Sequence, residues 1–131
     1  MVNSEPTKTQ VISVSEAKLI APRQLAHLGD AVFALFERER EILQSINVKQ
    51  MHEKVAHRSS AVVQAGLLEK LSSSLNDEEK DIVRRARNIK APSGRPGGQD
   101  HYRRATAFEA LLGFLYLTSK ERLAEILSLT V

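Results

Sequence analysis

The chain has 131 residues, enough for one domain whose core needs no disulfide or structural metal to hold it together. It contains no cysteine, which excludes disulfides, zinc–thiolate sites and thiol catalysis. A net charge of +3 is only mildly basic, so the positions of the charges say more about partners than their sum does.

The sequence also suggests where the domain begins and in which compartment the protein works. We expect residues 1–14 to form a mobile tail and residues 15–131 to form a single domain. The N-terminus lacks the basic and apolar regions of a secretory signal. No segment has the roughly 18 continuous apolar residues that a membrane span needs. We therefore expect a cytoplasmic protein, with an organellar stroma left open.

The expected elements are all helices, because strand-like alternation is missing and good helix formers dominate. Ser15 is placed to cap a short opening helix, and Pro22 suits the first turn of a second helix that runs to about Leu43. Two more helices are expected, from about 48 to 58 and from 60 to 71. The second helix has an amphipathic pattern at three- and four-residue steps, formed by Leu25, Leu28, Val32, Leu35 and Phe36.

The second half of the chain predicts three helices around one loop. Asn76 and Glu79 form a capping box that opens a helix reaching to about Ile89. Residues 91–100 contain two prolines and three glycines, which predicts a loop. A long helix over 102–118 follows, and Thr118 with Glu121 is placed to cap the last helix.

The helix around Glu109 is apolar almost all round. In so small a domain such a helix is covered on every side only if it is central or also packs on another chain. We therefore expect a homodimer.

Two of these helices each carry a single charge in apolar surroundings. Asp30 is the only formal charge between residues 24 and 36, and Glu109 is the only one between 105 and 117. Burying an unpaired carboxylate costs several kcal/mol or shifts its pKa until it is neutral, so such an acid usually has a partner. A metal ion shared by the two carboxylates is one such partner. The other interpretation is a solvated Asp30 and a buried Glu109 paired with an arginine.

Small residues flank both acids and would leave room for a metal ion, water or backbone: Ala26, Gly29, Ala105 and Gly113. Basic residues gather just before the Glu109 helix, in the stretch from Arg84 to Lys90, at Arg95 and at Arg103–Arg104. A charge run of this kind is either a solvated helix face or a surface that contacts nucleic acid. None of the four histidines is assigned chemistry, because none has the spacing of a helical metal pair.

The residues around the two acids are similar to motifs of a known family. Leu28-Gly-Asp30-Ala-Val32 resembles the ribonuclease III signature, and Phe108-Glu109-Ala-Leu-Leu-Gly113 resembles that family's second acidic motif. Arg87-Asn88-x-Lys90 and the stretch from Tyr102 to Leu115 look like the Mini-ribonuclease III branch, which lacks a double-stranded-RNA-binding domain. The resemblance covers residues 19 to 127.

The departures from ordinary ribonuclease III are informative. That enzyme carries acids four and seven residues before the signature aspartate, where this chain has Ala26 and Arg23. It has another acid three residues before the glutamate, where this chain has Thr106. Lacking these acids is typical of the Mini branch, and it implies a metal shell with more water.

The resemblance implies an all-α ribonuclease III-type endonuclease domain, a helical bundle that forms a homodimer. Asp30 and Glu109 would be the catalytic pair and would hold Mg²⁺, for which Mn²⁺ can substitute. The implied substrate is double-stranded RNA, in particular the precursor of large-subunit (23S) ribosomal RNA, and a ribosomal protein or particle is a further possible partner. The residues implied to contact RNA are Arg87, Asn88, Lys90, Arg95 and Arg103.

Two alternatives stay open at this point. The first is a non-catalytic ribonuclease III-like module that binds structured RNA or takes part in ribosome assembly. Retention of both Asp30 and Glu109 argues against it. The second is a plain helical dimerisation module, which would leave the basic residues between Arg84 and Arg104 without a role.

Overall fold

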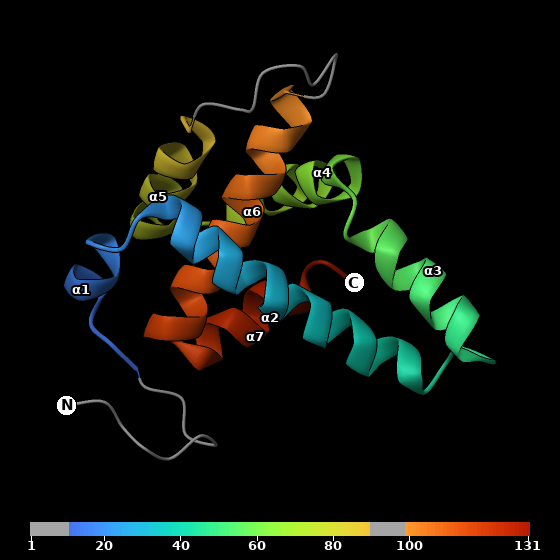
Figure 1. Ribbon diagram of the computed structural model, residues 1–131. Helices are drawn as coiled ribbons and strands as arrows, with labels where there is room; N and C mark the ends of the chain where they lie inside the picture. Colours follow the sequence, from blue (N-terminus) through green and yellow to red (C-terminus); the bar gives the residue numbers. More distant parts are fainter. Residues whose placement is uncertain (1–10, 90–98) are drawn as a thin grey trace.

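A computed structural model describes residues 11–89 and 99–131 (Figure 1). These residues form only helices, which confirms the predicted all-α class. Residues 1–10 of the expected tail, and most of the expected loop with Lys90 and Arg95, lie outside the described residues. The elements are α1 (Val14–Lys18), α2 (Pro22–Ile42), α3 (Val48–Arg58), α4 (Ala61–Leu71), the short 3₁₀ helix Ser72–Ser74, α5 (Asp77–Arg87), α6 (Gln99–Thr118) and α7 (Lys120–Ser128).

The capping box at the start of α5 is confirmed. The Glu79 N–H donates to Asn76 Oδ1 (2.9 Å), and the Asn76 N–H donates to Glu79 Oε1 (3.0 Å). None of the helices in the described ranges is long and apolar enough to cross a membrane.

Two other caps differ from the sequence-based expectation. Ser13, not Ser15, caps α1, and its Oγ accepts the Glu16 N–H at 3.1 Å. Ser119, not Thr118, caps α7, because a cap needs extended backbone and Thr118 still belongs to α6. The Thr118 hydroxyl donates instead to the Phe114 carbonyl, at 2.8 Å.

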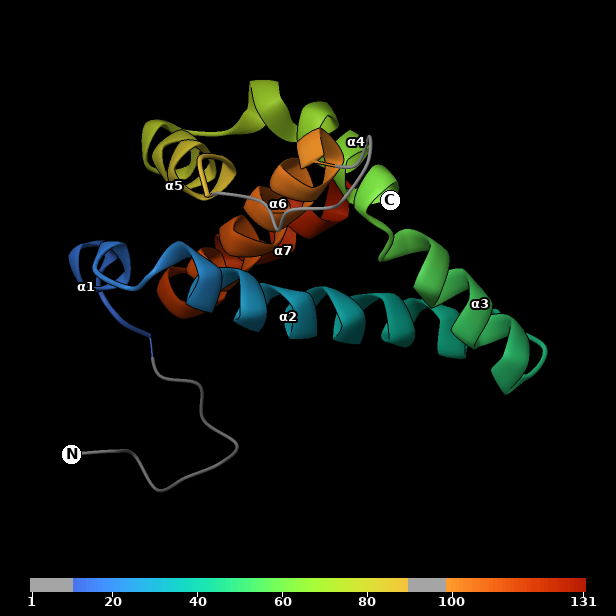
Figure 2. The ribbon, with the colours of Figure 1, turned by 45° about the horizontal axis from the view of Figure 1, so that its top comes forward.

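The central element is α6, which packs against α2, α4, α5 and α7. In Figures 1 and 2, α4 and α5 lie on either side of α6, and α2 crosses it. Phe108 of α6 is fully buried and meets Phe33 of α2 edge to face, with ring centroids 5.1 Å apart. The apolar pattern around Glu109 is thus explained in part by the central position of this helix.

The second helix buries a different face from the one that its leucine pattern suggests. Leu25 and Phe33 are buried against α6, whereas Leu28 and Val32 are half-buried and Leu35 is exposed. Both faces of α2 are therefore apolar, and only one of them packs inside the described chain.

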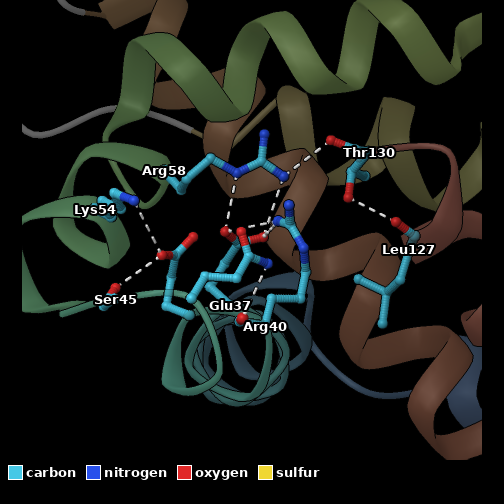
Figure 3. Close-up of polar contacts among 9 residues, drawn as sticks. Glu37, Arg40, Ser45, Lys54, Arg58, Leu127 and Thr130 are labelled. Atoms are coloured by element: carbon cyan, nitrogen blue, oxygen red, sulfur yellow. Dashed lines mark hydrogen bonds and ion pairs between the residues drawn. The ribbon is translucent and has the colours of Figure 1, made fainter.

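A buried ion pair joins the second half of α2 to α3 and to the C-terminal residues (Figure 3). The fully buried Glu37 accepts two hydrogen bonds from Arg58 of α3, at 3.0 and 3.1 Å, and two from Arg40, at 3.1 and 3.2 Å. Arg58 also donates to the Thr130 carbonyl at 2.9 Å. These charge-assisted bonds supply the partners that a buried carboxylate requires, and they hold α3 against α2.

Candidate active site

Two glycines set the distance between α2 and α6. A Cβ atom added to Gly29 would lie 1.7 Å from the Glu109 carbonyl oxygen, and one added to Gly113 would lie 2.0 Å from the Leu25 carbonyl oxygen. The two backbones therefore touch at a point where any larger residue would collide with main-chain atoms. Asp30 directly follows Gly29, so the contact between Gly29 and the backbone of Glu109 brings the two acids together.

The side chains of Asp30 and Glu109 interact. Asp30 is exposed and Glu109 is half-buried. Burial is the largest cause that raises the pKa of Glu109, followed by the hydrogen bond and the negative charge of Asp30, and the pKa reaches about 8. Glu109 therefore keeps its proton at neutral pH when no cation is present.

This geometry separates the two interpretations of the lone acids. Asp30 is exposed, as the structural interpretation expects. The charged group that acts on Glu109, however, is not an arginine but another carboxylate, that of Asp30.

An open hollow of about 290 Å³ lies beside the two acids. Its wall includes Ala26 and Thr106, two of the positions where ordinary ribonuclease III has further acids, and their small side chains contribute to the free space. The lining residues come from α2 and α6 and are Arg23, Ala26, His27, Asp30, Tyr102, Thr106 and Glu109.

The donor set fits Mg²⁺. Two carboxylates held side by side are an arrangement that a divalent cation stabilises, and the pKa of Glu109 is raised here. In residues 11–89 and 99–131 no group of three or more His, Cys, Asp or Glu side chains could hold a metal ion. Mg²⁺ is commonly bound through one or two carboxylates while it keeps several waters, so this sparse set suits it better than zinc or calcium.

The predicted RNA contacts that the structure describes are Arg87, Asn88 and Arg103, and none of these three lines the hollow. Arg87 is exposed near the end of α5, and Asn88 caps that helix. Arg87 lines a second, larger hollow of about 520 Å³ between α4, α5 and α6, together with Arg84 and Arg104. Arg103 is half-buried in α6, and its Nε has no hydrogen-bond partner among the residues that the structure describes. The structure thus brings Asp30 and Glu109 together and does not place Arg87 beside them.

Arg104 of α6 pairs with two acids. Its guanidinium lies 3.3 Å from Asp100 and 3.8 Å from Glu69.

One polar side chain at the site was not singled out from the sequence. Gln64 of α4 is 2% exposed, and its side chain approaches Glu109 closely enough to lower the pKa of that carboxyl. The available signal was that Gln64 is the only polar side chain between residues 61 and 68. An amide in an apolar helix is as easily a satisfied core group, so the pattern did not point to the acids.

The sequence matches the Ribonuclease III domain family over residues 23–120. It is 39% identical over 126 residues to the Mini-ribonuclease 3 of Thermoanaerobacter sp., covering 94% of this chain and 89% of that protein. It is 43% identical over 105 residues to the Mini-ribonuclease 3 of Gloeobacter violaceus, covering 80% of this chain and 78% of that protein.

The fold agrees with a crystal structure of a protein from Fusobacterium nucleatum. The TM-score is 0.77 at 29% sequence identity, over 85% of this chain and 93% of that one. By its sequence and its fold, the chain belongs to the ribonuclease III family, among the Mini-ribonuclease III proteins.

Proposed function

We propose that this ribonuclease III-family endoribonuclease cleaves double-stranded RNA with Mg²⁺ held by Asp30 and Glu109. The observation that carries the proposal is the contact between α2 and α6 at Gly29 and Gly113, which brings the two acids together beside an open hollow. The match to the family supports the reaction, and the two carboxylates support the choice of metal.

Each acid has a defined part in this proposal. Bound Mg²⁺ would polarise the scissile phosphate and lower the pKa of a coordinated water, and Mn²⁺ could replace it because both prefer oxygen ligands. Glu109 would give up its proton and bind through its carboxylate from the half-buried side, and Asp30 would bind from the exposed side. The open hollow leaves space for the phosphodiester, and hydrolysis would leave 5′-phosphate and 3′-hydroxyl ends.

The duplex would be held by four basic residues and one amide. We assign phosphate contacts to Arg87, Asn88, Lys90, Arg95 and Arg103, two of which lie outside the described residues. Contacts of this kind release counterions, so binding would weaken as the salt concentration rises.

We also propose a homodimer through the second apolar face of α2. Leu28, Val32, Leu35 and Phe36 form an open apolar groove with Leu123 and Leu127 of α7, with a volume of about 280 Å³. An exposed apolar groove is a typical subunit contact. Two copies would supply two carboxylate pairs, one for each strand of a duplex.

The biological substrate that we propose is the precursor of 23S ribosomal RNA, processed in the cytoplasm or in an organellar stroma. A ribosomal protein or particle would then be the natural partner.

Cleavage of a duplex RNA with and without Mg²⁺ tests the proposal. Asp30→Asn and Glu109→Gln should each reduce metal-dependent cleavage by at least about 100-fold while circular dichroism stays unchanged, because each replaces a charged ligand with a neutral amide. Glu53→Gln is the matched control, since Glu53 is exposed on α3 and does not line the hollow. If the wild-type protein binds the duplex but cleaves it with neither Mg²⁺ nor Mn²⁺, the non-catalytic alternative is correct.

A further inference from the structure

Gln64 is the most unusual buried polar group near the site. It lies in α4 among the buried core residues Ala65, Leu67 and Leu68. Its Nε2 is buried and has no hydrogen-bond partner within the part of the chain that the structure describes. Burying an amide without a hydrogen bond costs stability, and an apolar side chain would fill the same space without that cost.

The neighbour of this amide is Glu109. The side chain of Gln64 lies next to the Glu109 carboxyl group, where α4 packs on α6. Of the two polar atoms of this amide only Nε2 donates hydrogen bonds, and the oxygens of an ionised carboxylate only accept them, so the buried Nε2 and the Glu109 carboxylate are complementary. Glu109 is therefore approached from two elements, by Asp30 from α2 and by Gln64 from α4.

We infer that Gln64 is a positioning residue that donates a hydrogen bond from Nε2 to the Glu109 carboxylate and holds it in the orientation that binds the divalent cation. The inference rests on the proposed function, because it assigns Glu109 as a ligand. A carboxylate that binds a cation through one oxygen leaves the other oxygen in need of a partner, and Glu109 is half-buried. The unpartnered Nε2 is the donor available at this position.

The length of the side chain matters to this role. Gln64 must span the distance between the α4 backbone and the carboxyl group of a residue on α6, the helix that α4 packs against. Methionine has a similar length and no donor, so Gln64→Met removes the hydrogen bond and keeps most of the packing. Gln64→Leu removes the same donor with a side chain that suits a buried helix position, which provides a second variant if the first does not fold.

The experiment measures cation binding directly, besides cleavage. Binding of Mn²⁺ to the full chain is followed by electron paramagnetic resonance, and the rise in the unfolding midpoint on adding Mg²⁺ is measured in parallel. We expect Gln64→Met to weaken Mn²⁺ binding by about 10- to 100-fold and to raise by a similar factor the Mg²⁺ concentration for half-maximal cleavage. The midpoint without metal should be equal to or higher than that of the wild type.

Leu67→Met is the matched control on the same helix, because it changes the packing of a buried residue and removes no donor. It should shift the midpoint slightly and leave Mn²⁺ binding at the wild-type value. If Gln64→Met lowers the midpoint but binds Mn²⁺ as the wild type does, the role of Gln64 is structural and the inference is overturned. If the wild type itself neither binds Mn²⁺ nor cleaves duplex RNA, the proposed function fails, which is a distinct result.

Discussion

The proton on Glu109 makes the stability of the metal-free protein depend on pH. The pKa of this carboxyl is raised from its ordinary value of 4.5 to about 8 in the folded chain. Between these two values the folded protein keeps a proton that the unfolded chain has lost, so the free energy of unfolding falls as the pH rises, and it levels off above about 8. Urea unfolding at several pH values in the presence of EDTA would measure this fall.

Glu109→Gln is the comparison for that experiment, because glutamine is neutral at every pH. We expect the variant to lose the decrease in stability that the wild type shows between about pH 5 and pH 8. An identical pH dependence in the two proteins would mean that Glu109 is ionised in the folded, metal-free chain, contrary to the raised pKa.

At this scale the sequence predicted part of the site. Asp30 and Glu109 could be singled out because each is the sole charge in an apolar helix, and a lone acid requires a partner. Gln64 could not, because an amide has many possible partners and only the packing of α4 on α6 brings it to Glu109. The burial of Glu37 could not be predicted from the hydrophobic pattern of α2 either, since its partner Arg58 comes from another helix.

At the scale of elements, the contact between α2 and α6 depends on glycine. Gly29→Ala would place a methyl group 1.7 Å from a main-chain oxygen, which cannot rotate away. The helices would have to separate, so we expect a loss of about 3 kcal/mol or more in the free energy of unfolding. Cleavage should also fall, because the two carboxylates move apart with the helices.

Gly66→Ala is a control within the same chain. Gly66 is exposed in α4, and an added Cβ atom would meet nothing within 4 Å. Alanine should therefore stabilise the protein by about 0.5 to 1 kcal/mol. Chemical denaturation of both variants measures the difference, and equal stability of the two would show that α2 and α6 are not in backbone contact.

Several helix starts were predictable because their signals are local, although α1 and α7 are capped by Ser13 and Ser119 and not by the predicted Ser15 and Thr118. Pro22 begins α2, Asn47 and Ser60 cap the next two helices, and the box at Asn76 opens α5. The buried face of α2 was less predictable, because this helix is apolar on two sides and its sequence pattern does not show which side packs inside the domain. The choice depends on distant residues, namely Gly113 and Phe108 of α6.

At the scale of the whole molecule, the unused face of α2 points to the assembly. Leu35 is 59% exposed and lines the apolar groove between α2 and α7. Within residues 11–89 and 99–131 of one copy this exposure serves no packing role, whereas in a homodimer the same residues would form the centre of the contact. We expected a dimer because the helix near Glu109 is apolar on all sides. The groove between α2 and α7 is the surface on which we propose that the two copies meet.

Leu35→Glu tests this surface. A charge in the middle of an apolar contact would have to be buried without a partner. We therefore expect the variant to be a monomer of 14.6 kDa and the wild type to be a dimer of twice that mass. Sedimentation equilibrium at micromolar concentration measures both masses. Val62→Glu is the matched control, because Val62 is 62% exposed on α4 and does not line the groove, so it should stay dimeric. A dimeric Leu35→Glu variant would place the contact on another face, and a monomeric wild type would remove the assembly altogether.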